Sequence, residues 1–510
     1  MEKQLENKIV SLDELISIVS NYKKDGKVVV QSHGIFDLIH PGIVKHLNSA
    51  KDEGDILVVT VIKDTDVRRG PGRPIFPEDM RAKNVASLSQ IDYVCIVEDE
   101  NSFSCVQKIK PDIFAKGEAY KKRDKKIHKK IFEEERNIYF DKVQIHETKG
   151  FSFSSSQIIN QFLEMYSTDV KAFLKKFSEK YHFDKIVDMI NSLEDMKVLL
   201  IGDGIIDEYH YCTSMGKSAK SPLVVQQYQN HEVFAGGAFA IANHIGGVCN
   251  NIKLVTLLGE KDSKEDFINS CLKPNVSHKY FYRNDSTTTI KKRYIDQYLN
   301  QKLFEVNYLN SSYINKELEN EIITYLEEEI PKYDLVLTSD FGHGFISDPI
   351  IRTIEKHSKI LAVNTQTNGA NAGYNMITKY RDLHFICLDE PEVRWAAQNR
   401  YTNIEDVAKD LFEKINCDYL ITTLGKSGSI GMTKAGDFNR TPIFSTKVLD
   451  TVGAGDAFFA FTALCIAKDM PLDFVSFVGN AVGALAVQIM CNKKPVEKFE
   501  LLEFIHTILK

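Results

Sequence analysis

The stretch DTVGAGD at residues 450–456, which runs directly into an apolar helical segment, decides the fold of this 510-residue chain. A glycine-rich turn that enters a helix presents unpaired N–H groups at the positive end of the helix dipole, and such groups bind anions. Gly453 and Gly455 allow the backbone to approach a phosphate closely. Asp456 is expected at the helix start, where its carboxylate can accept a hydroxyl proton during phosphoryl transfer. A helix start that Asp456 merely caps is the alternative, but the whole string is far more specific than a lone G-x-G-D.

Strand-like and helical segments alternate around this string. Short apolar runs predict strands at 197–201, 253–257, 334–338, 359–363, 384–388 and 418–423. Polar, β-rich segments at 222–228 and 287–306 predict a small side sheet. The apolar stretch 474–490 contains Asn480 and is too short and too polar to cross a bilayer, so it predicts a buried helix. The C-terminal part is therefore predicted to be an α/β domain with a small β lid.

Residues 195–510 resemble the PfkB/ribokinase family of carbohydrate kinases, whose C-terminal signature matches 450–456. The resemblance implies that Asp456 is the catalytic base and that Gly453, Ala454 and Gly455 form its anion hole. The sugar ligands that it implies are Asp203, Asp207, Gly236, Gly237 and Asn243. The nucleotide ligands that it implies are Asp389, Glu392, Thr423, Gly425, Gly428 and Asn480.

Several positions depart from the family pattern. Asp389 replaces the usual Asn of an N-x-x-E pair, and His343 replaces the Lys of a D-Y-x-K-G-like segment. Residues 364–366 (NTQ) stand where a D-P-K-like strand end is common. Ala240 occupies the position of a sugar-binding Asn, although Asn243 is near. These changes affect the choice of substrate more than phosphoryl transfer, because the anion hole and its aspartate are intact.

The N-terminal part contains a second predicted phosphate site at residues 32–47 (SHGIFDLIHPGIVKHL). A strand at 27–31, a helix at 42–53 and a strand at 56–62 predict a parallel α/β unit. The glycine-containing turn after the first strand makes a phosphate cradle, and His40 lies just before the helix. His40 is therefore a candidate to donate to phosphate oxygens as charge builds in the transition state.

Residues 26–165 resemble the cytidylyltransferase-like nucleotidyltransferases, whose motif is G-x-F-D-x-x-H-x-G-H. The nucleotide site that this resemblance implies consists of Gly34, Phe36, Asp37, His40, Gly42, Lys116, Ser154, Ser155 and Ser156. The second motif histidine is missing, because position 43 is Ile. Losing one of two transition-state donors costs about 3–4 kcal/mol, by analogy with an oxyanion hole. His46 lies one turn later and is a candidate replacement, although an ordinary surface histidine is the simpler interpretation.

Composition restricts the partners and the location. The net charge of −6 does not favour a nucleic-acid partner. The basic run 121–130 indicates a solvated helix paired with the acidic residues that follow it, or else a flap over a triphosphate, and 291–293 indicate a charged β surface. Nine scattered cysteines without a C-x-x-C pair are typical of reduced thiols. The N-terminus has no signal-peptide core, so a soluble cytoplasmic protein without a membrane partner is expected.

These observations predict three segments and two α/β folds. We expect a Rossmann-like nucleotidyltransferase domain at 1–165, a helical connector at 166–194 and a ribokinase-like domain with a small β lid at 195–510. The two families occur together in the bifunctional enzymes of ADP-heptose synthesis, where the kinase comes first, whereas here the order is reversed. The resemblance implies phosphorylation of a sugar or sugar phosphate, followed by nucleotidyl transfer that makes a heptose-like nucleotide sugar for a surface glycan.

The same resemblance implies the cofactors and the assembly. We expect ATP and Mg²⁺ at the kinase site, a second nucleotide, either CTP or ATP, at the N-terminal site, and a homodimer. No residue is assigned as a direct metal ligand, although Glu392 is a candidate through water. One alternative is a kinase with an inert N-terminal binding domain, which Ile43 favours. Another is a regulatory pseudo-enzyme, against which the intact 453–456 turn argues.

Overall fold

The computed structural model describes residues 7–67, 70, 72–98, 103–117, 143–148, 159–160, 165–367, 369, 371–445 and 447–510. The chain divides into two compact units, of which the first comprises residues 1–187 with 502–510 and the second comprises 188–501. The segment expected to be a connector holds two helices, α9 (Thr168–Lys180) and α10 (Phe183–Asn191). The division falls within α10 and again within α19 (Lys498–Ile508), so the last residues of the chain belong to the first unit.

The first unit contains a parallel five-stranded sheet in the order β3-β2-β1-β4-β5. Its strands are β1 (Val29–Gly34), β2 (Ile56–Ile62), β3 (Tyr93–Val97), β4 (Ile113–Gly117) and β5 (Gln144–Thr148). Its helices, besides α9, are α2 (Leu12–Lys24), α3 (Pro41–Lys51), α4 (Glu78–Ala86) and α5 (Phe103–Ile109). One apolar cluster joins the sheet to α3 and α4, and another joins it to α2 and α5. The strand order reverses between β1 and β4, so their carboxyl ends form the crevice where parallel α/β sheets bind ligands.

The second unit is built on a nine-stranded sheet in the order β10-β9-β6-β13-β14-β15-β16-β17-β18, in which β17 alone runs antiparallel to the other strands. Its strands are β6 (Lys197–Gly202), β9 (Asn251–Lys261), β10 (Val276–Thr287), β13 (Leu335–Asp340), β14 (Leu361–Thr365), β15 (Asp382–Asp389), β16 (Asn416–Thr423), β17 (Ser429–Thr433) and β18 (Phe438–Thr441). Its helices are α11 (Ala238–Gly246), α12 (Glu265–Cys271), α13 (Lys316–Glu329), α14 (Asp348–His357), α15 (Glu390–Ala397), α16 (Ile404–Lys414), α17 (Ala454–Ala467) and α18 (Leu472–Ala486). The six strands and the buried helix predicted for this part are all present, whereas β10, β17 and β18 were not predicted.

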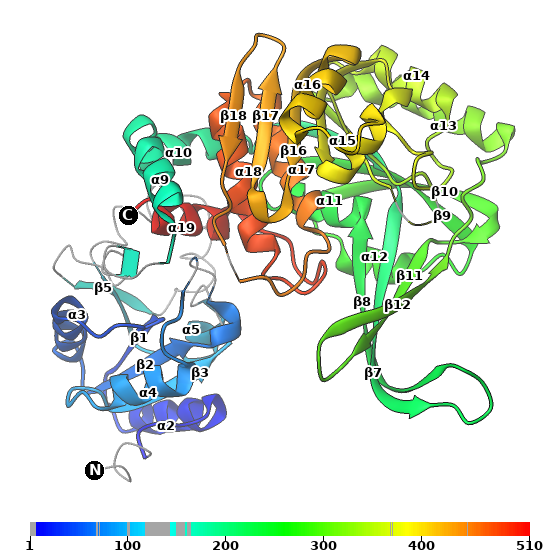
Figure 1. Cartoon of the computed structure of the whole chain (residues 1–510). Coiled ribbons are helices and arrows are strands. Elements are labelled where there is room, and N and C mark those ends of the chain that lie inside the picture. Colours follow the sequence, from blue (N-terminus) through cyan, green and yellow to red (C-terminus); the bar gives the residue numbers. More distant parts are fainter. Residues whose placement is uncertain are drawn as a thin grey trace. The chain divides into compact units, whose positions relative to one another are not determined.

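A separate four-stranded sheet forms the lid of the second unit, in the order β12-β11-β7-β8. Its strands are β7 (Gly204–Lys217), β8 (Val224–Gly237), β11 (Ile290–Asp296) and β12 (Gln301–Tyr308). In Figure 1 the long β7–β8 hairpin projects away from the main sheet of the unit. The predicted side sheet is therefore confirmed, and β7 is its unpredicted member.

Two further observations concern expectations from composition. Among the described residues, no helix combines the length and the apolar character that a bilayer crossing requires. All nine cysteines lie in the described chain and form no disulfide with one another, and all but the half-buried Cys271 are buried.

Candidate functional site

The start of α17 has the geometry of an anion hole. Gly453 precedes this helix with a φ of 85°. A Cβ at Gly453 would lie 1.9 Å from Oδ1 of Asn492, so both the backbone and the space require glycine here. A Cβ at Gly455 would meet no atom within 4 Å, so the first turn of the helix borders open space. The N–H groups of Gly453 and Gly455 therefore lie where an anion can approach them, and the N–H of Ala454 between them donates a long bond of 3.3 Å to the carbonyl of Thr451.

Asp456 lies in the first turn of α17 and is only 7% exposed. The Nε2 of Gln366 donates a hydrogen bond of 2.8 Å to its Oδ1. Burial, reinforced by the nearby Asp207, raises the pKa of Asp456 to about 7, against the lowering effects of Gln366 and Lys291. A carboxylate with a pKa near neutrality suits a general base. From the sequence, position 366 was identified only as a departure from the family pattern. That departure is the signal that could have indicated the contact of Gln366 with Asp456.

Asp203, which follows β6, and Asp207, on β7, are brought to the same site as Asp456. The Oδ2 of Asp203 accepts hydrogen bonds from the backbone N–H groups of Phe341, at 2.9 Å, and His343, at 3.5 Å. Burial and the neighbouring Asp340 raise the pKa of Asp203 to about 7.

The diglycine segment lies beside these two aspartates. A Cβ at Gly236 would lie 2.0 Å from Oδ2 of Asp207, so a side chain there would displace this carboxylate. At the next position, the carbonyl of Asp203 lies 2.6 Å from a Cβ built on Gly237. Both predicted glycines thus contact the aspartates that the resemblance assigned to the sugar.

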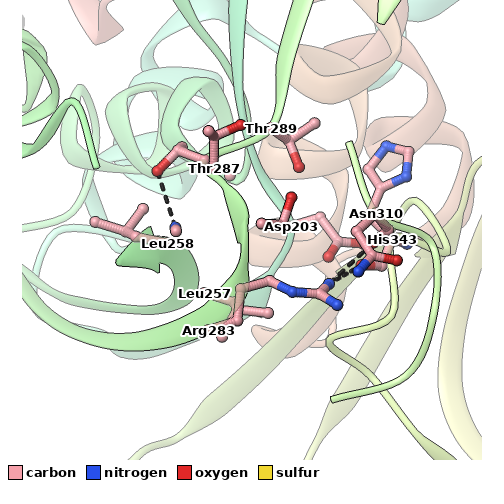
Figure 2. Close-up of a pocket in the computed structure, with 12 residues that line it drawn as sticks. Asp203, Leu257, Leu258, Arg283, Thr287, Thr289, Asn310 and His343 are labelled. Carbon is pink, nitrogen blue, oxygen red and sulfur yellow. Dashed lines mark hydrogen bonds between the residues drawn. The ribbon is translucent and has the colours of Figure 1, made fainter. Parts of the chain in front are cut away.

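A polar pocket lies beside Asp203, between the end of β10 and the loop after β13 (Figure 2). Thr287 and Thr289 contribute to its lining, as does Arg283, whose Nη1 donates to the carbonyls of Asn310, at 2.9 Å, and His343, at 3.3 Å. The His343 ring is 4% exposed, and neither ring nitrogen has a hydrogen-bond partner in the described chain. Burial lowers the pKa of His343 to about 3, so the ring is neutral.

Asp389 and Glu392 form a capping box at the start of α15. The N–H of Glu392 donates to Oδ1 of Asp389 at 2.9 Å, and the N–H of Asp389 donates to Oε2 of Glu392 at 3.0 Å. Burial, followed by the charge of Asp389, raises the pKa of Glu392 to about 8. No Lys or Arg of the described residues forms an ion pair with either carboxylate. Glu392 is buried and Asp389 is exposed, and such an acidic pair without a cation fits a divalent ion held through water.

The predicted nucleotide loop lies between β16 and β17. Thr423 ends β16, and the N–H of Leu424 donates to the carbonyl of Gly428 at 2.8 Å, which closes a tight turn. Gly425 adopts a φ of 54° and Gly428 a φ of 85°. From α18, the Nδ2 of Asn480 donates to Oγ of Ser429, the residue after the turn, at 2.6 Å. The structure thus gathers these four predicted positions around one turn.

Asn243 is not brought to the sugar site by its described contacts. On α11, its Nδ2 donates to the carbonyl of Cys271 at 3.0 Å, and its Oδ1 accepts from the N–H of Lys273 at 2.9 Å. Both ends of the amide therefore hold the chain after α12. A role of Asn243 in sugar binding stays a prediction without support from this geometry.

For Lys291 and Arg293 of the lid, the structure contradicts the interpretation that the sequence suggested. Residues 291–293 were expected to form a charged surface, yet Lys291 is 7% exposed and Arg293 is mostly covered. Arg293 pairs through Nη1 with Asp207 and through Nε with Glu305, the latter at 2.8 Å. Lys292 points to the opposite face, where it pairs with Glu208 at 3.2 Å. The missed signal was strand alternation, which places 291 and 293 on one face and 292 on the other.

The N-terminal site positions His40 through the backbone. His40 is the N-cap of α3, and its Nδ1 accepts a hydrogen bond of 3.2 Å from the N–H of Gly42. Burial lowers the pKa of His40. Because Nδ1 accepts, the proton of the neutral ring resides on Nε2, which can donate to a phosphate.

The side chains of Asp37 and Arg81 form hydrogen bonds that hold the loops around His40. Asp37 is buried and accepts from the N–H groups of Ile75, at 2.8 and 2.9 Å, and Phe76, at 3.0 Å. Arg81 is fully buried and donates to the carbonyls of Ile35, at 2.6 Å, and Ile62, at 2.7 Å. Asp37 therefore serves the local fold in this structure, and its contact with a nucleotide stays a prediction.

The remaining predicted positions of this site differ in what the structure says of them. Gly34 ends β1, and Phe36, which follows, is buried with a φ of 53°. The Nζ of Lys116, on β4, lies 5.7 Å from the ring centroid of Phe114. The predicted residues Ser154, Ser155 and Ser156, and the basic run 121–130, lie outside the described residues.

The replacement of the second motif histidine is visible in the packing of α3. Ile43 packs against the apolar cluster between the sheet and this helix. His46, one turn later, is half-buried, and its Nε2 lies 2.8 Å from Oγ of Ser32 on β1. It therefore points back to the sheet instead of lying on the open surface.

Comparison with known proteins gives matches for both units. Residues 195–494 match the family model of the pfkB family carbohydrate kinases, and residues 32–161 match the cytidylyltransferase-like model. The bifunctional protein HldE of Sulfurimonas denitrificans is 41% identical over 114 residues, which cover 22% of this chain and 24% of that protein. HldE of Campylobacter jejuni is 23% identical over 320 residues, which cover 61% of this chain and 66% of that protein. The matched regions therefore span from about a quarter to two thirds of the relatives' length.

A solved structure supports the fold of the second unit. Phosphofructokinase-2 from Escherichia coli, in complex with fructose-6-phosphate, superposes with a TM-score of 0.50 at 11% identity and covers 62% of this chain and 100% of that one. At this identity the similarity shows the fold and nothing further.

Proposed function

The chain belongs to the pfkB family of carbohydrate kinases and carries a cytidylyltransferase-like domain ahead of the kinase domain, and from this premise we propose two consecutive reactions. The second unit phosphorylates a sugar or sugar phosphate with ATP. The first unit transfers a nucleotidyl group from CTP or ATP to a sugar phosphate and releases pyrophosphate. The product is a nucleotide-activated sugar, heptose-like by analogy with the HldE relatives, for a surface glycan.

The arrangement of Asp456 carries the proposal for the kinase. Its buried carboxylate adjoins both the open first turn of α17 and Asp207, one of the two aspartates proposed to bind the acceptor. The acceptor hydroxyl passes its proton to Asp456, and the hydroxyl oxygen attacks the γ-phosphorus. The bond from that phosphorus to the β–γ bridging oxygen breaks, and ADP leaves. The N–H groups at 453–455 stabilise the negative charge of the phosphoryl oxygens.

Mg²⁺ fits this site through the pair Asp389 and Glu392. Glu392 is buried, Asp389 is exposed, and neither carboxylate has a cationic partner in the described chain, so a divalent ion held through water would relieve their mutual repulsion. The ion would supply charge neutralisation for the triphosphate. Thr423, Gly425, Gly428 and Asn480 are proposed to position the nucleotide.

The proposal for the first unit rests on His40. Its Nε2–H is directed by the backbone bond at Nδ1 and can donate to the triphosphate as pyrophosphate departs. A second candidate function, a kinase with an inactive N-terminal binding domain, is favoured by Ile43, which fills the place of the second histidine with an apolar contact.

A homodimer through the lid is also proposed. Every residue of β12 is exposed, including Leu303, Phe304, Val306 and Tyr308. Apolar side chains on an exposed strand favour association with another copy. Light scattering on the full chain tests this, since Phe304→Glu is expected to convert a dimer into a monomer.

The experiment that tests the proposed function separates the two reactions. Purified full chain is assayed for ADP formation against a panel of sugars and sugar phosphates, and for pyrophosphate release with each of the four NTPs and a panel of sugar 1-phosphates. Both products are expected. ADP without pyrophosphate selects the kinase with an inert N-terminal domain, and neither product on any acceptor contradicts the proposal.

A further inference from the structure

Lys291 is a buried cation on the inner face of the lid. It lies on β11, where the register places it directly opposite Asp207 of β7 and Asn307 of β12. Directly opposite residues on neighbouring strands share one face of a sheet, so Lys291 lies on the same face as the Asp207 carboxylate. Its Nζ lies 5.4 Å from the ring centroid of Phe341, in the loop after β13.

Among the described residues, no carboxylate lies within ion-pair distance of Lys291. The acidic groups nearest in the lid are already paired, since Asp207 and Glu305 both bind Arg293. A lysine that is 7% exposed and unpaired is costly, because a buried charge normally has a partner. This cost indicates that an anionic ligand completes the site.

His343 gives a second, independent indication. Its ring is 4% exposed and stacks on Phe341 at 6.2 Å between centroids. Neither ring nitrogen has a hydrogen-bond partner in the described chain. Buried polar nitrogens rarely remain unsatisfied in a finished site. A neutral imidazole beside an ammonium, both without partners, is suited to a ligand that accepts hydrogen bonds and carries negative charge.

The charges around Lys291 place it on the acceptor side of the kinase site. Its ammonium acts electrostatically on the base Asp456 and on His343. The charged side chains that act on Lys291 itself are Asp203 at the end of β6, Asp207 on β7, Arg293 on β11 and Glu305 on β12. The ammonium therefore lies among the base and the predicted sugar ligands.

We propose that Lys291, assisted by His343, binds the oxygens of a phosphoryl group on the acceptor side of the kinase site. This rests on the proposed kinase function. Lys291 stays protonated throughout and supplies hydrogen bonds and charge, while the hydroxyl proton goes to Asp456. The phosphoryl group is either the one in transfer from ATP or one that the acceptor already carries.

The matched pair Lys291→Met and Lys292→Met tests the proposal in the full chain. The two lysines are adjacent on one strand, but Lys292 faces the other side and pairs with Glu208. With the acceptor found in the panel above, Lys291→Met is expected to lower kcat/KM by about 10²–10³-fold, as the loss of one transition-state donor does. Lys292→Met is expected to change it less than about threefold, within the range of a lost surface ion pair.

Two readouts identify the source of the phosphoryl group. A fall in kcat with an unchanged KM, seen with phosphorylated and unphosphorylated acceptors alike, assigns Lys291 to the phosphoryl in transfer. A rise in KM confined to phosphorylated acceptors assigns it to the acceptor's own phosphate. Either result supports the proposal, whereas a loss in kcat/KM of less than about threefold with every acceptor overturns it.

A binding measurement keeps the proposal falsifiable if no turnover is found. Inorganic phosphate is titrated calorimetrically into the full chain saturated with Mg·ADP, which occupies the nucleotide side. Lys291→Met is expected to weaken phosphate binding at least about tenfold relative to Lys292→Met, since a charge-assisted hydrogen bond is lost. Equal phosphate affinity in the two variants overturns it. A lower melting temperature in Lys291→Met, with all steps reduced alike, assigns the lysine a structural role instead.

Discussion

The two units bury charged side chains in different ways. In the first unit, backbone N–H groups satisfy the carboxylate of Asp37, and backbone carbonyls together with an ion pair to Asp64 satisfy the guanidinium of Arg81. In the second unit, burial raises the pKa of Asp456 and Glu392, and Lys291 has no ion-pair partner in the described chain. Charges that the backbone satisfies shape a site, whereas charges left open are available to a ligand.

This difference has a consequence for pH dependence. The proposed kinase base, Asp456, must be ionised to accept a proton, and burial and Asp207 raise its pKa to about 7. Kinase kcat/KM is therefore expected to fall as the pH drops through about 7. The reaction proposed for the first unit relies on His40, whose pKa is lowered by burial, so the neutral form of His40 persists further into acid. The reactions of the two units should separate below neutrality.

The largest expected effect is that of Asp456→Asn on the kinase alone. An amide cannot accept the hydroxyl proton, so ADP formation is expected to fall by about 10²–10⁴-fold. Coupled detection of ADP measures this, and pyrophosphate release by the same preparation is the internal control. An unchanged rate of ADP formation would show that Asp456 is not the base. A parallel loss of pyrophosphate release would show that the two sites are not independent.

His40→Ala is the converse variant. It removes the Nε2–H donor, and pyrophosphate release is expected to fall by about 10²–10³-fold while ADP formation is unchanged. The N-cap bond to Gly42 is also lost, so His40→Asn, which retains a side-chain cap, is the matched control. Retained pyrophosphate release in both variants would show that the first unit uses another donor, with His46 the nearest candidate by sequence.

Much of this comparison was predictable from the sequence, because periodicity and short motifs are local. The strands that flank the two phosphate turns, and the glycines of 453–455, follow from apolar runs and the needs of a tight turn. Pairing between strands depends on residues that are far apart in the sequence, so β7 and β10 were not predicted. Strand β7 alternates between buried and exposed positions only weakly along its first half, and the end of β10 is polar.

The site residues divide in the same manner. Motif positions that touch one another through the backbone, such as Asp389 with Glu392, were found through the resemblance to the family's N-x-x-E pair. Gln366 and Lys291 were missed because their roles depend on contacts across the sheet and the lid, with Asp456 in the one case and opposite Asp207 in the other. Asn243 was chosen because it lies near Ala240 in the sequence; its amide bonds to the chain after α12, and its role in sugar binding stays a prediction.

Gln366→Ala tests how far the kinase site depends on such a long-range contact. The Gln366 hydrogen bond lowers the pKa of Asp456, so its loss raises that pKa and leaves less of the base ionised at pH 7. Activity at pH 7 is expected to fall about tenfold, because a hydrogen bond to a charged group contributes about 1.5 kcal/mol. In a pH–rate profile, the fall of activity on the acidic side should occur at a higher pH in the variant, and activity should recover at alkaline pH. A profile that falls in amplitude without moving would mean that Gln366 acts on something other than the base.

Asp389→Asn restores the usual family residue and should have the smallest effect. Asn caps a helix about as well as Asp, so the start of α15 is retained. Removing the neighbouring negative charge lowers the pKa of Glu392 from about 8, since that charge is the second cause of the shift after burial. In the proposed site Glu392 must be ionised to hold Mg²⁺. The KM of the wild type for Mg·ATP is therefore expected to fall as the pH rises through about 8. In the variant the same fall in KM should occur at a lower pH. The change at pH 7 should stay within about fivefold, because the lost attraction to the cation opposes the easier ionisation. Glu392→Gln cannot ionise at this position, so the pH dependence of KM should disappear in this variant. If KM still depends on pH in Glu392→Gln, a different group controls the nucleotide site.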